Sequence, residues 1–288
     1  RMGALFTLPP RDWQKISPPS RCFAEPRGRL WLTVMCGIAA QFAYRPAAPP
    51  VARASLLAVR EAMAARGPDG AGLWLSDDGR VGLAHRRLAI IDLSDQGAQP
   101  MARSGRDGRV HVSYNGEIYN FRELRAAMEA QGERFATQSD TEVLLALYAR
   151  EGDGFVARLR GMFAFVLWDE GQRRMLLARD PFGIKPLYYA DGGGALRAAS
   201  SVKALLAGGG IDTAPDPAGH AGFFMLGSVP EPHTLYKGVR ALPAGHTLVV
   251  TERGVEAPKP YFFLRDAQCR AATGAEPSLA DALRDSIS

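Results

Sequence analysis

Residues 35–44 have the sequence Met35-Cys36-Gly37-Ile38-Ala39-Ala40-Gln41-Phe42-Ala43-Tyr44, an apolar segment rich in Ile, Ala and Phe. An apolar run of this length predicts a strand buried in the core. The segment also begins with a thiol that directly follows a methionine. Removal of an initiator methionine would make Cys36 the first residue of the chain.

A cysteine in that position holds a nucleophile and a base in one residue. An α-amino group has a pKa of about 7.7 to 8.0, so a useful fraction is neutral at physiological pH and accepts a proton from the thiol. A nucleophile activated by its own chain terminus is a known arrangement for acyl transfer. Taken alone, a Cys before apolar residues is more often a buried core thiol, so the interpretation depends on the rest of the sequence.

Residues 1–34 are rich in Pro, Arg and Gly and show no sustained helical or strand period. We expect them to be an extension outside the fold, either from a mis-set start or as a propeptide whose removal exposes Cys36. The first interpretation is favoured because Met35 is itself a sufficient start. If the segment stayed attached, the amine would be an amide and would lose its basicity.

The charge of the chain is concentrated in that extension. The 288 residues carry 35 Lys and Arg against 30 Asp and Glu, and residues 1–34 hold six basic and two acidic residues. The nearly neutral remainder predicts no nucleic-acid partner. Three scattered cysteines fit neither a disulfide framework nor a zinc site, which favours a reducing, cytoplasmic setting. No apolar run approaches the roughly 18 residues of a membrane span, so we expect no membrane partner.

Strand and helix signals alternate in blocks. Helices are predicted over 52–65, 121–130 and 143–150, the last after a capping sequence at 139–142. Strands are predicted over 36–44, 72–75, 81–91, 110–115, 162–168, 175–179, 187–190, 195–200, 246–251 and 255–261. Prolines between 208 and 245 predict loops. This order favours an α+β sandwich of two antiparallel sheets with outer helices over a βαβ wound sheet.

The segment 114–120 interrupts a predicted strand with the pair Asn115-Gly116. The simplest interpretation is a tight hairpin turn, which Asn-Gly favours for backbone reasons. The alternative is catalytic. An Asn side-chain amide and a Gly backbone N–H that lie side by side can donate to the same developing oxyanion.

Two charged residues suggest how a substrate would be held. Arg87 lies in the apolar segment 85–92, where most arginines are solvated or paired, yet a guanidinium is also the natural clamp for an α-carboxylate. Asp140 at a predicted helix start is more often a cap, but it also suits a substrate ammonium. Together with a thiolate that attacks a side-chain carbonyl, these residues indicate glutamine as the substrate.

Several ordered motifs resemble the glutaminase domain of glutamine-hydrolysing asparagine synthetases. They cover residues 35–206 densely, and weaker likeness continues to the C-terminus. The motifs are Cys36-Gly37-Ile38, Arg66-Gly67-Pro68-Asp69-Gly70, the segment 85–94, Tyr114 to Asn120, Ser139-Asp140-Thr141-Glu142, Gly161 to Phe165, and Arg179 to Tyr189. The resemblance implies an N-terminal-nucleophile fold, a four-layer αββα sandwich of two antiparallel sheets.

The resemblance also implies a role for each candidate residue. Cys36 would attack glutamine, release ammonia and leave a γ-glutamyl thioester that water hydrolyses to glutamate. The remaining residues would form the oxyanion hole (Asn115 and Gly116), hold the α-carboxylate (Arg87), hold the α-amine (Asp140) and complete the pocket (Glu117 and backbone groups near Leu88 and Ile90). No metal and no cofactor are expected for this domain.

By the same resemblance, residues 36–207 form the glutaminase domain, 208–277 the closing strands and a linker, and 278–288 the start of a truncated synthetase domain. In the family, ammonia attacks an aspartyl adenylate made with Mg-ATP in that second domain, and asparagine, AMP and pyrophosphate result. The Ser-Gly-Gly-x-Asp-Ser nucleotide loop of the family does not occur here. We therefore expect this chain to supply the glutaminase half, with aspartate as the ammonia acceptor elsewhere.

Two alternatives remain open. The first is another class II amidotransferase with a different amide acceptor, although the segment Arg87 to Asp92 favours the asparagine synthetase branch. The second is a non-catalytic glutamine-binding module, because an acylated Cys36 would keep the pocket without its base. A homodimer is compatible with either.

Overall fold

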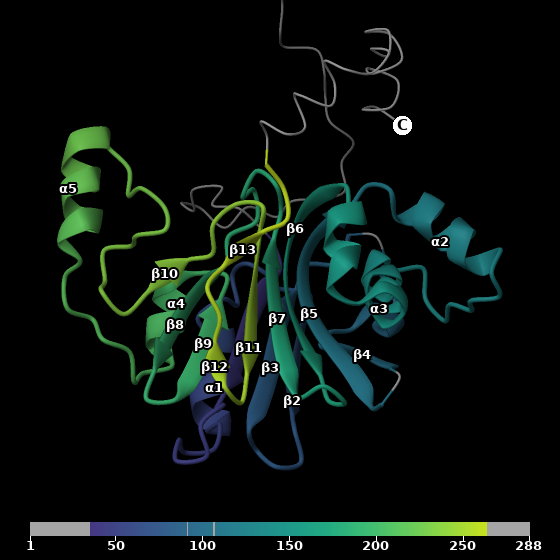
Figure 1. The fold of residues 1–288 in the computed structure, drawn as a ribbon, viewed down its shortest axis with the longest axis horizontal. Coiled ribbons are helices and arrows are strands. Elements are labelled where there is room, and N and C mark those ends of the chain that lie inside the picture. Colours follow the sequence, from purple (N-terminus) through teal and green to yellow (C-terminus); the bar gives the residue numbers. More distant parts are fainter. Residues whose placement is uncertain (1–34, 91, 106, 264–288) are drawn as a thin grey trace, which may run out of the picture. The chain divides into compact units, whose positions relative to one another are not determined.

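The computed structural model describes residues 35–90, 92–105 and 107–263. The predictions for residues 1–34 and 278–288 lie outside the described residues. Within the described part, two antiparallel sheets lie face to face, with helices on their outer sides (Figure 1). This arrangement confirms the predicted α+β sandwich.

The first sheet has six strands, with β1 (Gly37–Phe42) near its centre. Its other strands, in spatial order, are β10 (Arg240–Ala241), β8 (Tyr188–Gly192), β9 (Ala195–Ala199), then beyond β1 β3 (Val81–Arg87) and β2 (Gly70–Leu75). Helices α1 (Arg53–Glu61) and α4 (Val202–Ala207) pack against the outer face through Leu56 and Leu205.

The second sheet has seven strands. In spatial order they are β12 (Gly254–Val255), β11 (His246–Thr251), β7 (Arg174–Arg179), β6 (Gly161–Asp169), β5 (Arg109–Ile118) and β4 (Met101–Ser104), while β13 (Lys259–Pro260) pairs with β11. Helices α2 (Phe121–Glu129) and α3 (Asp140–Glu151) cover its outer face, and two short 3-10 helices span Asp95–Gly97 and Gly152–Arg158.

Side-chain alternation in β1 explains the four layers. Ile38 and Phe42 point into the core between the sheets, whereas Ala39 points to the core under α1. Successive strand residues face opposite sides, so a strand that is apolar throughout is buried on both faces. Phe42 meets Trp168 of β6 edge to face, with ring centroids 4.9 Å apart. None of the helices within the described ranges is long and apolar enough to cross a membrane.

The hairpin turn that the pair Asn115-Gly116 favours on backbone grounds does not form. Strand β5 continues through both residues and stays paired with β6 to its end at Ile118. A Cβ on Gly116 would lie 2.3 Å from the Met162 carbonyl oxygen and 2.7 Å from the Phe163 Cα. The glycine therefore allows a close approach of β6 rather than a turn. The strand predicted over 81–91 is also shorter, because β3 ends at Arg87.

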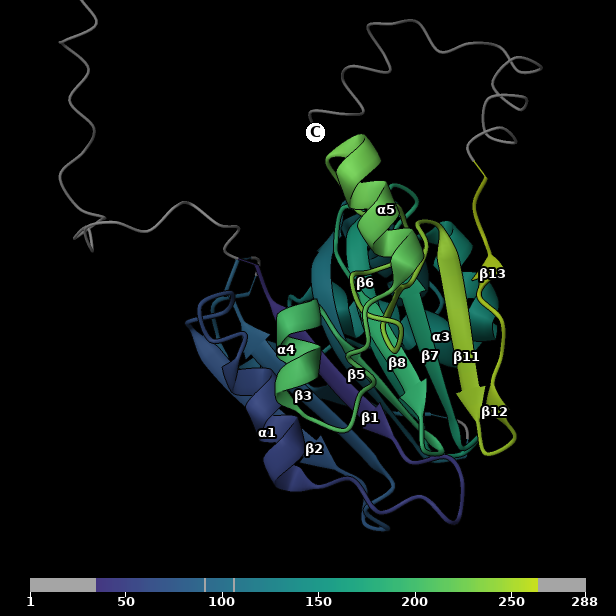
Figure 2. The same cartoon turned by 90° about the vertical axis from the view of Figure 1, so that its left-hand side faces the viewer.

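Helix α5 (Pro217–Leu226) occupies a segment that the sequence analysis assigned to loops. The prolines were misleading, since Pro217 lies in the first helical turn, where its missing N–H costs nothing. Asp216 caps the helix by accepting from the Ala218 N–H at 3.0 Å. Gly222 lets the helix approach Pro230 closely. Figure 1 and Figure 2 both show α5 above α4.

His85 predicts a pH-dependent stability. Its Nδ1 lies 3.0 Å from the Ser113 Oγ, and burial lowers the pKa of His85 to about 3. In the unfolded chain His85 takes up a proton near pH 6.5, while the folded protein keeps it neutral, so stability falls as the pH falls from 6.5. Between pH 7 and pH 5 we expect the titration of His85 to lower the free energy of unfolding by about 2 kcal/mol.

Urea unfolding at both pH values measures this loss. The His85→Gln variant, which cannot titrate, should lose about 2 kcal/mol less than the wild type over the same interval. An equal loss in the two proteins would contradict the assignment.

Candidate active site

All eight residues that the sequence analysis selected line one pocket. It lies where β1 begins, β3 ends, β5 ends and α3 begins. The eight are Cys36, Arg87, Leu88, Ile90, Asn115, Gly116, Glu117 and Asp140. They come from four separate stretches of sequence, so the fold brings them together.

Cys36 is held directly before β1 by contacts on both sides. The Leu88 N–H points at its sulfur, with 3.3 Å between N and Sγ. Arg66 Nε donates to the Cys36 carbonyl oxygen at 3.3 Å, and the Met35 N–H donates to the Arg66 carbonyl oxygen at 2.9 Å. The thiol therefore has a fixed place at the pocket wall.

Burial raises the pKa of the Cys36 thiol above its ordinary value. The Leu88 N–H and the positive charges of Arg87, Lys185 and Arg66 act in the opposite direction but do not overcome burial. The thiol is therefore protonated at neutral pH. Nucleophilic attack requires a base that removes this proton.

Asn115 presents an unused donor to the pocket. The residue is 2% exposed, and its Nδ2 has no hydrogen-bond partner within the described part of the chain. A buried donor without a partner costs about 1 to 3 kcal/mol. An oxyanion or carbonyl oxygen in the pocket would satisfy it. Gly116 follows it in β5 and lines the same pocket.

Arg87 is fixed by the loop that follows β3. Its Nη1 donates to the Ser94 carbonyl oxygen at 2.8 Å, and its Nη2 donates to the Asp92 carbonyl oxygen. A Cβ on Gly97 would lie 2.5 Å from this Nη2, so the glycine makes room for the guanidinium. Each Nη group carries a second N–H, which leaves donors for a carboxylate.

Asp140 is not the cap of its helix. Ser139 is the N-cap, with its Oγ accepting from the Thr141 N–H at 3.2 Å. The Asp140 Oδ2 instead accepts from the Tyr114 hydroxyl at 2.7 Å and from the Ile118 N–H at 3.1 Å. Burial raises the pKa of Asp140, and these two hydrogen bonds oppose the rise. The carboxylate is thus oriented toward the pocket from a buried position.

Sequence analysis did not select several further residues that line the pocket, among them Gln99, Tyr114 and Lys185. Gln99 Oε1 accepts from the Tyr114 N–H at 2.7 Å, which ties the loop after β3 to β5. Tyr114 and Lys185 both belong to motifs quoted above, so their place in these motifs was the signal available. Gln99 had no such signal.

Lys185 reaches the pocket from a tight loop after β7. Asp180 is fully buried and its carboxylate accepts from four backbone N–H groups, at 2.9 to 3.3 Å. The four donors are Phe163, Phe182, Ile184 and Lys185. Arg179 closes the loop from outside, with Nη2 donating to the Gly183 carbonyl oxygen at 2.7 Å.

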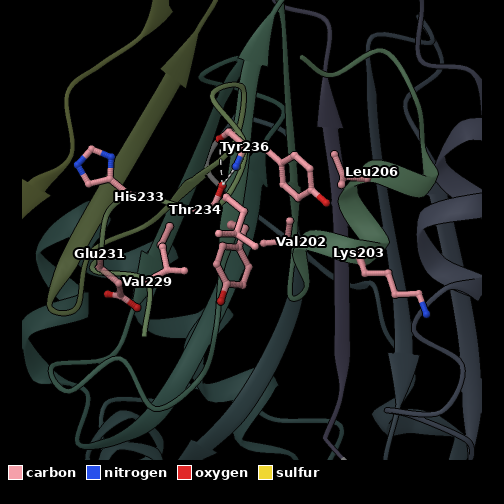
Figure 3. A pocket seen from close by; sticks show the side chains of 11 residues that line it. Val202, Lys203, Leu206, Val229, Glu231, His233, Thr234 and Tyr236 are labelled. Carbon is pink, nitrogen blue, oxygen red and sulfur yellow. Dashed lines mark hydrogen bonds between the residues drawn. The ribbon is translucent and has the colours of Figure 1, made fainter. Parts of the chain in front are cut away.

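A second cavity of about 460 Å³ lies next to α4 (Figure 3). Its walls include Val202, Leu206, Val229 and Tyr236, and in Figure 3 the Tyr236 ring points toward Leu206. It shares no lining residue with the Cys36 pocket and contains no cysteine. Its size alone gives it no catalytic chemistry.

Residues 35–262 match the family described as glutamine amidotransferase domain. The putative glutamine-hydrolysing asparagine synthetase of Mycobacterium tuberculosis is 44% identical over 208 residues, which cover 69% of this chain and 31% of that protein. Glutamine-hydrolysing asparagine synthetase 1 of Bacillus subtilis is 37% identical over 254 residues, which cover 88% of this chain and 39% of that protein.

The chain thus spans between 31% and 39% of the length of these two relatives. Among solved structures, the glutamine phosphoribosylpyrophosphate amidotransferase of Bacillus subtilis aligns with a TM-score of 0.60 at 23% identity. The alignment covers 79% of this chain and 50% of that one. At this identity the likeness concerns the fold alone.

The loop after β7, whose backbone N–H groups bind the Asp180 carboxylate, provides a test of how Lys185 is held in the pocket. In Asp180→Asn, an NH₂ group replaces one oxygen and faces two N–H donors, so we expect a loss of about 3 kcal/mol in the free energy of unfolding. Chemical denaturation measures it, and Asp77→Asn at an exposed turn is the matched control. Equal stability of the two variants would mean that the carboxylate does not organise the loop.

Proposed function

This chain belongs to the family of glutamine amidotransferase domains, and we propose that it hydrolyses glutamine to glutamate and ammonia through a thioester on Cys36. The observation that supports this reaction best is the unpaired, buried amide of Asn115 in the same pocket as the thiol. Such a donor suits an oxygen that becomes negative during acyl transfer.

In the proposed reaction, the terminal amine of Cys36 takes the thiol proton, and the sulfur attacks the side-chain carbonyl carbon of glutamine. The developing oxyanion accepts hydrogen bonds from Asn115 and from the Gly116 N–H. When the tetrahedral intermediate collapses, the C–N bond breaks and the amine returns the proton to the departing ammonia. Water then adds to the thioester, and glutamate and the free thiol are released.

The other pocket residues would hold the amino-acid end of glutamine. We assign the α-carboxylate to the remaining N–H groups of Arg87 and the α-ammonium to Asp140. Glu117 and the backbone near Leu88 and Ile90 complete this part of the pocket. The hydrogen bonds of Arg87 and Asp140 to their neighbours reduce the entropy lost when substrate binds.

For the whole protein we propose glutamine-dependent asparagine synthesis. The relatives named asparagine synthetase support this, and their greater length leaves room for a domain that uses Mg-ATP and aspartate. We assign no cofactor to the glutaminase step, and we place the protein in the cytoplasm. A different amide acceptor and a homodimer are compatible with the same glutaminase pocket.

The deciding experiment compares two proteins, one beginning at Cys36 and one that retains residues 1–35. We expect glutamate release from the first and none from the second, because an acylated amine accepts no proton. Cys36→Ala, begun at the same position, should bind glutamine without turnover. Glutamine binding without glutamate release by the folded shorter protein would instead favour a binding module.

Asn115→Ala tests the oxyanion assignment. We expect kcat to fall about 10²-fold to 10³-fold with little change in KM, because the lost donor acts chiefly in the transition state. Steady-state kinetics of glutamate release separate the two parameters. An increase in KM with unchanged kcat would show that Asn115 only binds the ground state.

A further inference from the structure

Two cations line the Cys36 pocket, and they differ in their partners. Arg87 donates to backbone carbonyl oxygens, as described above. Lys185 is 7% exposed, and its one hydrogen bond from Nζ within the described residues goes to the Met35 thioether, at 3.3 Å from the sulfur. A thioether is a weak acceptor. The buried ammonium therefore lies beside residue 35, and none of the hydrogen bonds from its Nζ within the described residues goes to a carboxylate or carbonyl oxygen.

The backbone holds Lys185 in this place. Its N–H donates to the Asp180 carboxylate at 2.9 Å, and its carbonyl oxygen accepts from Arg179 Nε at 3.0 Å. Asp180 and Arg179 are both buried. Because both ends of the residue are fixed by buried groups, the ammonium is directed at the start of β1 by the fold.

The charged groups around Lys185 come from several elements. Glu117 of β5, Cys36 before β1, Arg66 after α1 and Asp180 after β7 all act on it. Burial lowers the pKa of the Lys185 ammonium, against the pull of the Glu117 carboxylate. On the thiol, the charge of Lys185 acts in the same direction as those of Arg87 and Arg66 and favours the thiolate.

Lys185 and Cys36 line the same pocket. Removal of Met35 takes away the thioether that the Lys185 ammonium contacts and creates a terminal amine on the adjacent residue, Cys36. We propose that Lys185 is a positioning residue for the nucleophile, whose positive charge keeps this amine in its neutral, proton-accepting form. The proposal rests on the proposed function, since it concerns the same base. Two neighbouring cations repel each other, so the terminal ammonium loses its proton at a lower pH than it would alone.

The pH profile of kcat/KM for glutamate release tests the proposal on protein that begins at Cys36. Activity falls at low pH as the amine becomes protonated. In Lys185→Met and Lys185→Gln this acid limb should move up by about one pH unit. The kcat/KM of these variants should therefore be roughly tenfold below that of the wild type near pH 6 and equal to it at high pH. Lys185→Arg keeps the charge and should keep the limb.

Lys203→Met, in the second cavity, is the matched control and should leave the profile unchanged. A readout without turnover is the rate of Cys36 alkylation by iodoacetamide, followed by mass spectrometry of the Cys36 peptide. Its pH midpoint should also rise in Lys185→Met, because the thiolate loses a neighbouring cation.

The outcomes separate the two proposals. If the wild type releases glutamate but Lys185→Met and Lys185→Gln keep its acid limb and its alkylation midpoint, the role of Lys185 is overturned and the glutaminase stands. A deficit that is equal at every pH also overturns it. If no protein that begins at Cys36 releases glutamate, both proposals fail together.

Discussion

The pairing of β1 at the centre of the first sheet determines where the Cys36 thiol lies. Its register with β3 places Gly37 opposite Arg86, and its register with β9 places Ala39 opposite Ala199. Cys36 therefore lies where β3 ends, with its sulfur beside the Leu88 N–H. Because β1 is buried on both faces, a shift by one residue would exchange its two apolar faces and move the thiol.

Around that fixed point, the polar side chains serve the fold and the pocket together. Arg87 bonds to the loop that follows its own strand, and the Asp140 carboxylate joins α3 to β5 through Tyr114. These contacts explain how the half-buried Arg87 and the buried Asp140 are accommodated here, since each is hydrogen-bonded to neighbouring protein groups. The Asn115 Nδ2 has no such partner in the described part of the chain, which distinguishes it from Arg87 and Asp140.

The sequence predicted the layered architecture well, because apolar runs such as 36–44 and 162–168 are long and bounded by turn residues. The sequence-based prediction failed where a contact with a residue far away in the sequence determines the local conformation. Asn115-Gly116 has the composition of a turn, but Gly116 is needed because β6 passes too close for a side chain at this position. Helix α5 contains two glycines and a proline, and Gly219 and Gly222 permit close contact with the segment 230–234. Neither contact is visible in local sequence.

The same limit applies to the candidate site. Motifs identified the eight pocket residues, yet Gln99 was missed because its role depends on a contact with Tyr114 fifteen residues away. The contacts of the Arg87 guanidinium and the identity of the residue that caps α3 also depend on the tertiary structure and could not be predicted from the sequence. Sequence spacing gave the kinds of residue in the pocket, and tertiary packing decided which of their atoms remain available.

The lack of a histidine among the described residues of the thiol pocket supports the role proposed for the terminal amine. No histidine lines the Cys36 pocket within the described ranges, and His85 of the neighbouring strand bonds to Ser113. Burial keeps that imidazole neutral, but its position between the sheets removes it from the pocket. A thiol whose pKa is raised by burial still has to lose a proton. In the proposed reaction the α-amine of the same residue accepts that proton, and only the Cα and Cβ atoms separate it from the sulfur.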